Sequence, residues 1–278
     1  MRRILWICFL LWPFLAGGQD TSTIETELKK LAWQVGPSDA RIGDKATINV
    51  PANHVFLDEK NTRRFLELMG NPPQDGHYLL APDTLEWFSV FSFNPSGYVK
   101  DDEKIDAEAL LKGLKDSDGP ANEERQRLGM SKIYTDGWEV PPHYDTQTKR
   151  LEWGTRLKDD QGRTSVNYTS RLLGRSGVMS ATLVTGTNTL AADTARFKAA
   201  IEKFSYVPGE NYFEFKEGDK LAAYGLGALI LGGAAAVATK KGLWAVLGGF
   251  FAAFWKILVG IGVAAIAGFK SMFKSNKA

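Results

Sequence analysis

A long apolar stretch near the C-terminus constrains this 278-residue chain more than any other feature. Residues 221–239 read LAAYGLGALILGGAAAVAT and contain no charged side chain. As an α-helix rising about 1.5 Å per residue, these nineteen residues approach the roughly 30 Å hydrocarbon thickness of a bilayer. Because Lys240 and Lys241 end the run, we predict that residues 221–239 form the first helix of a membrane-anchor region at residues 219–278.

A second apolar run occupies residues 242–269 and is interrupted only by Lys256. A helix at about residues 243–269 is long enough to cross back, but it would bury Lys256 and leave the last lysines outside. The alternative is a segment that lies in the cytoplasmic interface, or that dips into the bilayer and returns to the cytoplasmic side. We predict a hairpin whose two helices associate, because small residues recur every four positions in each run and allow close packing. Such residues also suit lipid-facing positions. They are Ala228, Gly232, Ala236, Gly260, Ala264 and Gly268.

The N-terminus has the pattern of a secretory signal peptide at residues 1–18. Arg2 and Arg3 precede an apolar run at residues 4–15, and Ala16 and Gly18 supply the small residues that signal peptidase needs. The alternative, an uncleaved membrane helix, is disfavoured because the run is short. The only cysteine of the chain falls inside this leader, so the mature protein is predicted to have neither a thiol nor a disulfide.

Charge separates the middle of the chain from its C-terminus. Residues 19–218, the predicted extracytoplasmic domain, hold 25 basic and 31 acidic residues, which gives a net charge of about −6. The segment that follows is strongly positive. A mildly acidic domain argues against nucleic acid as a partner.

Local patterns within this domain predict an α+β fold on a mostly antiparallel sheet with a few helices, followed by the C-terminal membrane helices. Alternating or β-branched runs predict strands, and apolar residues at helical spacing predict helices. The expected strands lie at residues 46–50, 77–81, 87–93, 138–140, 151–157, 165–173 and 178–184. The expected helices lie at residues 61–69, 107–114 and 190–204, with residues 115–127 as a polar loop that could continue into a short helix.

No pattern assigns a catalytic, cofactor-binding or metal-binding residue. Asp101, Asp102, Glu103 and Asp106 could hold a cation, but acids at the start of a helix explain the cluster more simply. The three histidines are isolated, and there is no nucleophile-elbow or phosphate-loop motif. We therefore expect neither a cofactor nor a metal.

Aromatic residues beside turns provide the candidate recognition surface. Trp87 and Trp153 lie in expected strands and are predicted to be core. Side chains near Pro or Gly are better placed to be exposed, and with neighbouring acids they form the predicted surface: Tyr98, Asp101, Asp102, Trp138 and Tyr144.

Several motifs occur together in this chain. They are GYVKDDE (97–103), IDAEALL (105–111), GW-x-x-PP-x-YD (137–145), LEWGTRL (151–157), VNYTSRLLGRSGVMS (166–180) and GDKLAAYGLGALILGG (218–233). With the leader, they resemble the family of membrane-anchored bacterial proteins catalogued as domain of unknown function number 2167. The resemblance implies an exported protein held in the membrane by its C-terminus, and it carries over no catalytic residue.

These features together predict a protein of the bacterial inner membrane whose main domain faces the periplasm or outer surface. The expected partners are the lipid bilayer and another envelope protein. We expect a non-enzymatic binding or scaffolding role. The alternative is an envelope hydrolase whose site is assembled from separated residues, which would require a deep pocket with convergent polar groups.

Overall fold

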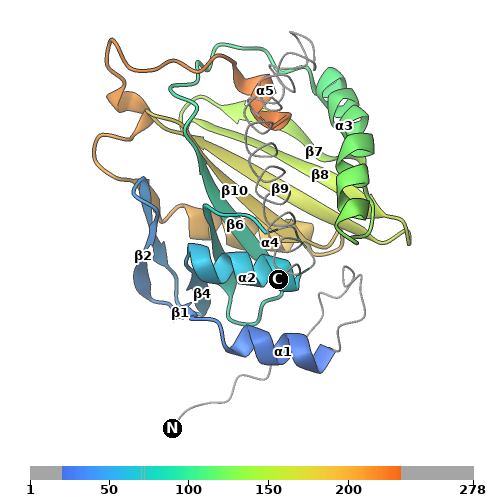
Figure 1. Cartoon of the computed structure of the whole chain (residues 1–278). Coiled ribbons are helices and arrows are strands. Elements are labelled where there is room, and N and C mark those ends of the chain that lie inside the picture. The colour runs from blue at the N-terminus through green and yellow to red at the C-terminus, as the bar shows by residue number, and fades with distance from the viewer. Residues whose placement is uncertain (1–20, 70, 72, 233–278) are drawn as a thin grey trace, which may run out of the picture. The chain divides into compact units, whose positions relative to one another are not determined.

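The computed structural model describes residues 21–69, 71 and 73–232 (Figure 1). The predicted signal peptide, the end of the first apolar run and the whole second run lie outside these residues. Among the described helices, none is both long and apolar enough to cross a membrane.

An antiparallel sheet of eight strands forms the centre of the domain, as the alternating sequence patterns predict. In spatial order its strands are β1 (Gln34–Val35), β4 (His54–Leu57), β5 (His77–Pro82), β6 (Phe88–Asn94), β10 (Val178–Thr185), β9 (Thr164–Leu173), β8 (Arg150–Asp159) and β7 (Ile133–Asp145). A second, three-stranded antiparallel sheet has the order β11 (Phe204–Tyr206), β3 (Ala46–Val50) and β2 (Ser38–Ile42).

Helices and the small sheet cover both faces of the large sheet (Figure 1). One face packs against α4 (Leu190–Ile201) and the small sheet. The other face packs at one end against α1 (Thr21–Lys29) and α2 (Glu59–Leu68), and at the other end against α3 (Ala107–Arg127) and α5 (Leu226–Ile230). Strand alternation separates the two cores, since Leu80 of β5 faces α4 while Leu79 and Ala81 face α2.

The predicted fold class is confirmed for the domain, and several elements lie close to their predicted positions. The strand at residues 46–50 is β3, and the expected strand at residues 87–93 is β6, which contributes side chains to cores on both of its faces. Trp87 and Trp153 are buried, as predicted. Phe197 and Ile201 are buried on α4, but Phe204 lies in β11 and not in the helix.

The helix after β6 is longer than predicted. Residues 115–127 were expected to be a polar loop that could continue into a short helix, and they instead continue α3 to Arg127 despite Pro120. Side chains in this half of the helix are bonded to β7: the Asn122 amide pairs with both backbone groups of Ile133, and Asp118 accepts from Thr135. These tertiary contacts stabilise a helical segment whose sequence alone is not distinctively helical.

The described start of the first apolar run also differs from prediction. Residues 221–225 are not helical, and α5 spans only Leu226–Ile230. Leu226 and Leu229 are buried against α3 and β8, and the compact unit that contains the sheet ends at Leu231. Because a protein core and a bilayer both take up apolar side chains, the hydropathy of the run could not show that its first residues belong to the domain.

Candidate functional site

Asp101, in the loop after β6, is the centre of a polar cluster close to the β7–β8 turn. Its Oδ2 atom accepts a hydrogen bond from the Tyr144 hydroxyl at 2.8 Å and pairs with the Lys149 ammonium at 2.7 Å. Tyr144 lies on β7, and Lys149 lies in the turn, where its φ of 55° places it in the left-handed region. The turn therefore directs a cation toward a carboxylate that is distant in the sequence.

An aromatic stack adjoins this cluster. The ring of Tyr98 lies 4.4 Å from that of Tyr212, in the 3-10 helix η1 (Tyr212–Glu214), and 4.3 Å from that of Phe215. The Lys149 ammonium lies 5.2 Å from the Tyr212 ring and 5.6 Å from the Phe213 ring, which are cation–π distances. We call Tyr98, Tyr212, Phe213, Phe215 and Leu221 the aromatic edge.

Asp101 and Tyr144 each keep a single ionisation state at neutral pH. Burial alone would raise the pKa of Asp101, but hydrogen bonds from Lys149 and Tyr144 outweigh it and lower the pKa. Burial and the neighbouring Asp101 raise the pKa of Tyr144, so its phenol stays protonated as a donor. Asp101 is thus a permanent acceptor and cannot supply a proton near pH 7, where a general acid would need a raised pKa.

The structure brings together three of the five predicted recognition residues. Tyr98, Asp101 and Tyr144 meet in this cluster, whereas Asp102 is exposed outside the contacts described above. Trp138 is half-buried: its Nε1 atom donates to the carbonyl oxygen of Ala107 at 2.9 Å, so the side chain anchors the start of α3 and not a surface. Only Asp106 of the acidic run caps α3, through the backbone N–H of Ala109.

The sequence patterns did not identify five members of the site: Lys149, Tyr212, Phe213, Phe215 and Leu221. The signal for the aromatics was present, because the run NYFEFKEGDK at residues 211–220 places three aromatic side chains in an otherwise charged segment. No local pattern could have identified Lys149, since its partner Asp101 lies far away along the chain.

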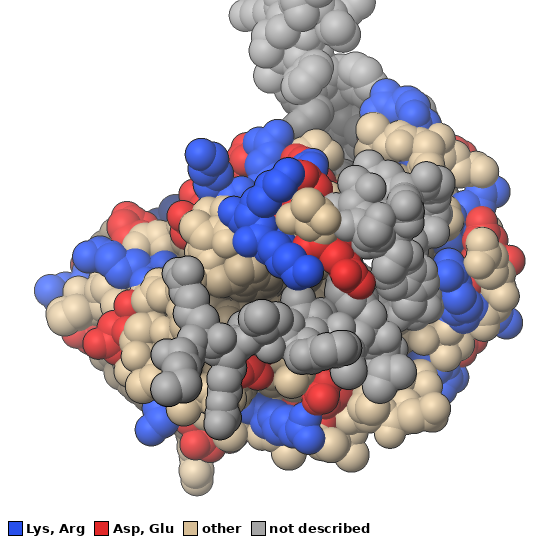
Figure 2. Space-filling view, turned by 90° about the horizontal axis from the view of Figure 1, so that it is seen from below, with Lys and Arg blue, Asp and Glu red and all other residues tan. Residues whose placement is uncertain are grey.

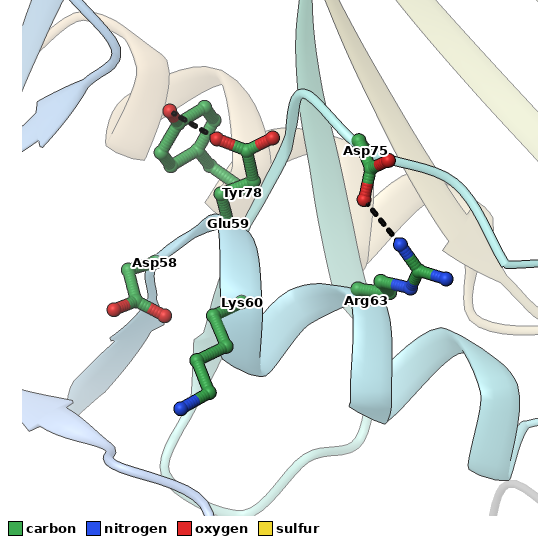
Figure 3. Close-up of a pocket in the computed structure, with 6 residues that line it drawn as sticks. All are labelled: Asp58, Glu59, Lys60, Arg63, Asp75 and Tyr78. Atoms are coloured by element: carbon green, nitrogen blue, oxygen red, sulfur yellow. Dashed lines mark hydrogen bonds and ion pairs between the residues drawn. The ribbon is translucent and has the colours of Figure 1, made fainter.

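A second polar surface lies at the N-terminus of α2, where an open pocket of about 460 Å³ is lined by Asp58, Glu59, Lys60, Arg63, Asp75 and Tyr78 (Figure 3). Asp58 caps the helix through the backbone N–H of Asn61, which corrects the prediction that the helix begins at Asn61. Arg63 pairs with Asp75 at 2.6 Å, and Glu59 accepts from the backbone N–H of Gly76. The carboxylates of this pocket are therefore engaged in structural contacts.

A third group lies between the sheet and α4. The Glu152 carboxylate pairs with Lys198 at 2.7 Å and lies 3.4 Å from Nε2 of His143. Burial raises the pKa of Glu152, but Lys198 outweighs it and the pKa is lowered; burial raises the pKa of Tyr168 to about 12. Ser170, which is paired in register with Glu152, is fully buried, so it offers no accessible nucleophile. In the part of the chain that the structure describes, no three side chains form a metal-binding cluster.

Comparison with solved structures finds a similarity to the solution structure of cyanobacterial PsbP (CyanoP) from Synechocystis sp. PCC 6803. The two share 10% sequence identity, with a TM-score of 0.35 over 63% of this chain and 92% of that chain, a likeness too low to support an argument. A search of curated proteins finds no match. A family model described as "Protein of unknown function (DUF2167)" matches residues 34–266, which is most of the sequence and includes the whole large sheet and the aromatic edge. This chain therefore belongs to that family.

Proposed function

We propose that this protein is a membrane-anchored component of the bacterial envelope whose extracytoplasmic domain binds or scaffolds and carries out no covalent chemistry. One contrast supports the proposal. The clustered ionisable side chains are paired within the fold, whereas Phe213, Phe215 and Leu221 of the aromatic edge are left exposed. Recognition surfaces have this composition, while catalytic sites need titratable groups poised near the working pH.

The ionisation of the carboxylates is the more specific part of this argument. Every described carboxylate whose pKa is shifted has a lowered pKa: Glu27, Asp101, Asp136, Asp145, Glu152, Asp159, Glu210 and Asp219. A general acid or a neutral-pH base would require the opposite shift. Seven of these groups act as fixed anions that hold a basic partner, and Asp145 accepts from the backbone N–H groups of Gln147 and Thr148.

The membrane attachment in this proposal rests on the sequence. The leader at residues 1–18 and the apolar runs ending at Phe269 favour export followed by retention. In this proposal another envelope protein approaches the open pocket at the start of α2, at the end of the sheet away from β7 and β8. Figure 2 shows one face of the molecule with basic and acidic side chains interspersed, which suits a protein partner better than a nucleic acid.

Site-specific crosslinking in intact cells tests the binding role. A photoreactive residue replacing Lys60, in the α2 pocket, is expected to give a discrete protein adduct with the full-length chain. Lys112 on α3 is the control, because its side chain is 76% exposed but lies outside the pocket. Equal labelling from both positions, or from neither, would argue against a partner at this face.

The competing hydrolase hypothesis has its own test. The purified full chain would be assayed against envelope esters, amides and glycosides beside Lys198→Met, which disrupts the ion pair with Glu152. We expect no turnover from either protein. Turnover that disappears in Lys198→Met, with folding retained, would replace the binding proposal with an enzymatic one.

A further inference from the structure

The exposed apolar side chains of the domain are concentrated in one segment. Val35 is exposed by itself on β1, and Leu128 and Tyr134 form an exposed pair at the turn between α3 and β7. In contrast, three large apolar side chains fall within nine residues: Phe213 is 71% exposed, Phe215 38% and Leu221 48%. Exposed apolar groups that cluster in this way mark an interaction surface, whereas scattered ones need no explanation.

Tyr98 joins these side chains into one surface. Its ring contacts Phe215, its backbone N–H donates to the carbonyl oxygen of Lys220, and its carbonyl oxygen accepts from Ala222. Leu221 is thereby bridged to the backbone of Tyr98. The two chain segments that form the aromatic edge consequently lie side by side.

The edge is held rigidly. Asn211 and Glu214 form a capping box around η1, and the Tyr212 hydroxyl donates to the carbonyl oxygen of Val99 at 3.0 Å. Arg175 makes two hydrogen bonds to Asp219, at 2.6 and 2.8 Å. A surface fixed in this way can present apolar groups to a partner without first losing conformational entropy.

Charge around the edge suits a lipid headgroup layer. Glu210 pairs with Lys45, Asp219 pairs with Arg175, and Glu214 accepts from backbone N–H groups, so these acids are compensated within the fold. Lys100, Lys216 and Lys220 are exposed in the two segments that form the edge, together with the acids Asp102, Glu214 and Glu217. Phenylalanine and leucine flanked by lysine form the usual composition of a surface that enters the membrane interface.

The course of the chain after the aromatic edge favours the bilayer as the partner of this surface. Leu221 is both part of the edge and the first residue of the uncharged run that ends at Thr239. Between Leu221 and Leu231 the chain is packed on the domain and does not act as a free linker. The chain leaves this compact unit at Leu231, ten residues after Leu221, and a bilayer that receives the rest of the run is tethered to the domain there.

We propose that the aromatic edge inserts Phe213, Phe215 and Leu221 into the headgroup–acyl boundary of the bilayer that anchors the protein. This inference rests on the proposed membrane attachment and adds the orientation of the domain: the edge faces the lipid. The end of the sheet that carries α2 then remains available to other partners.

Depth-dependent fluorescence quenching tests the orientation. The full-length chain, on a Cys8→Ser background, is labelled with an environment-sensitive fluorophore at Phe213→Cys and reconstituted in phosphatidylethanolamine–phosphatidylglycerol vesicles that contain nitroxide-labelled lipid. The matched control is Val35→Cys, because Val35 is 64% exposed and lies on β1, at the edge of the sheet opposite β7. We expect a blue-shifted emission and several-fold stronger quenching at position 213 than at position 35.

The possible results separate this inference from the attachment proposal. Vesicle flotation reports attachment, and quenching reports orientation. If the protein floats but positions 213 and 35 are quenched equally, the edge does not face lipid and the inference is overturned. A blue shift without lipid quenching, or energy transfer between labelled copies, would assign the edge to a protein partner or to a second copy and would also overturn it. Failure to float would refute the attachment itself.

Discussion

At the scale of single residues, Asp101 connects a loop, a strand and a turn. We expect Asp101→Asn to lower the free energy of unfolding by about 1–3 kcal/mol, because it weakens the bonds to Tyr144 and leaves Lys149 without its counter-charge. The matched variant Tyr144→Phe removes one donor only and should cost about 1 kcal/mol. Urea unfolding at pH 7 measures both losses. Equal losses in the two variants would contradict the assignment of Lys149 as the main partner.

Asp219 provides a prediction of pH dependence at the same scale. Hydrogen bonds from Arg175 and from the backbone N–H of Lys216 lower its pKa to about 2. A group whose pKa is lowered by folding stabilises the protein above its unfolded pKa, near 4, and loses that contribution as the pH falls through the folded value. The wild type should therefore lose more stability than Asp219→Asn between about pH 4 and pH 2. Parallel acid-unfolding curves would show that the pair does not contribute.

At the scale of elements, the structure predicts that the start of the apolar run stabilises the domain. Leu226→Ala should cost about 2–5 kcal/mol, because Leu226 is 1% exposed in the core beneath α3. Leu221→Ala, in the same run but at an exposed position, should change stability by less than about 0.5 kcal/mol. Thermal unfolding of the full chain in detergent compares them. A negligible effect of Leu226→Ala would show that residues 221–231 do not pack on the domain.

The second half of α3 is the other element whose structure depends on its surroundings. Asn122→Ala removes two hydrogen bonds of 2.8 Å and leaves the backbone groups of Ile133 unpaired at a site where Asn122 is buried. We expect a loss of about 2–4 kcal/mol and reduced helicity by circular dichroism. Ser117→Ala is the control, because this hydroxyl bonds only to the carbonyl oxygen of Leu114 within the helix.

At the scale of the whole molecule, the sequence predicts the topology. If residues 242–269 return across the bilayer, the C-terminal lysines face outward, and Ser275→Cys on the Cys8→Ser background should react with an impermeant thiol reagent in intact spheroplasts. The control is labelling after lysis, which should proceed in either arrangement. Reaction only after lysis would mean a single crossing, with the second run held on the cytoplasmic side.

Much of the fold could be predicted because its signals are local. Strand alternation has a period of two residues, so segments such as residues 46–50 and 165–173 indicate their own structure. The burial of Trp87 and Trp153 follows from the same patterns. Export, anchoring and the sign of the charge on each segment are likewise properties of composition, and the sequence supports them as predictions without reference to the fold.

Only the tertiary structure decided which distant segments meet. The last half of α3 is helical because Asp118 and Asn122 bond to β7, and the aromatic edge exists because Tyr98 pairs with residues 220–222. The beginning of the apolar run joins the domain core because its leucines find a complementary surface between α3 and β8. Hydropathy indicates that a side chain is more stable out of water, and both a protein core and a lipid bilayer provide such an environment. Which of the two it enters depends on tertiary contacts, and no local sequence pattern contains them.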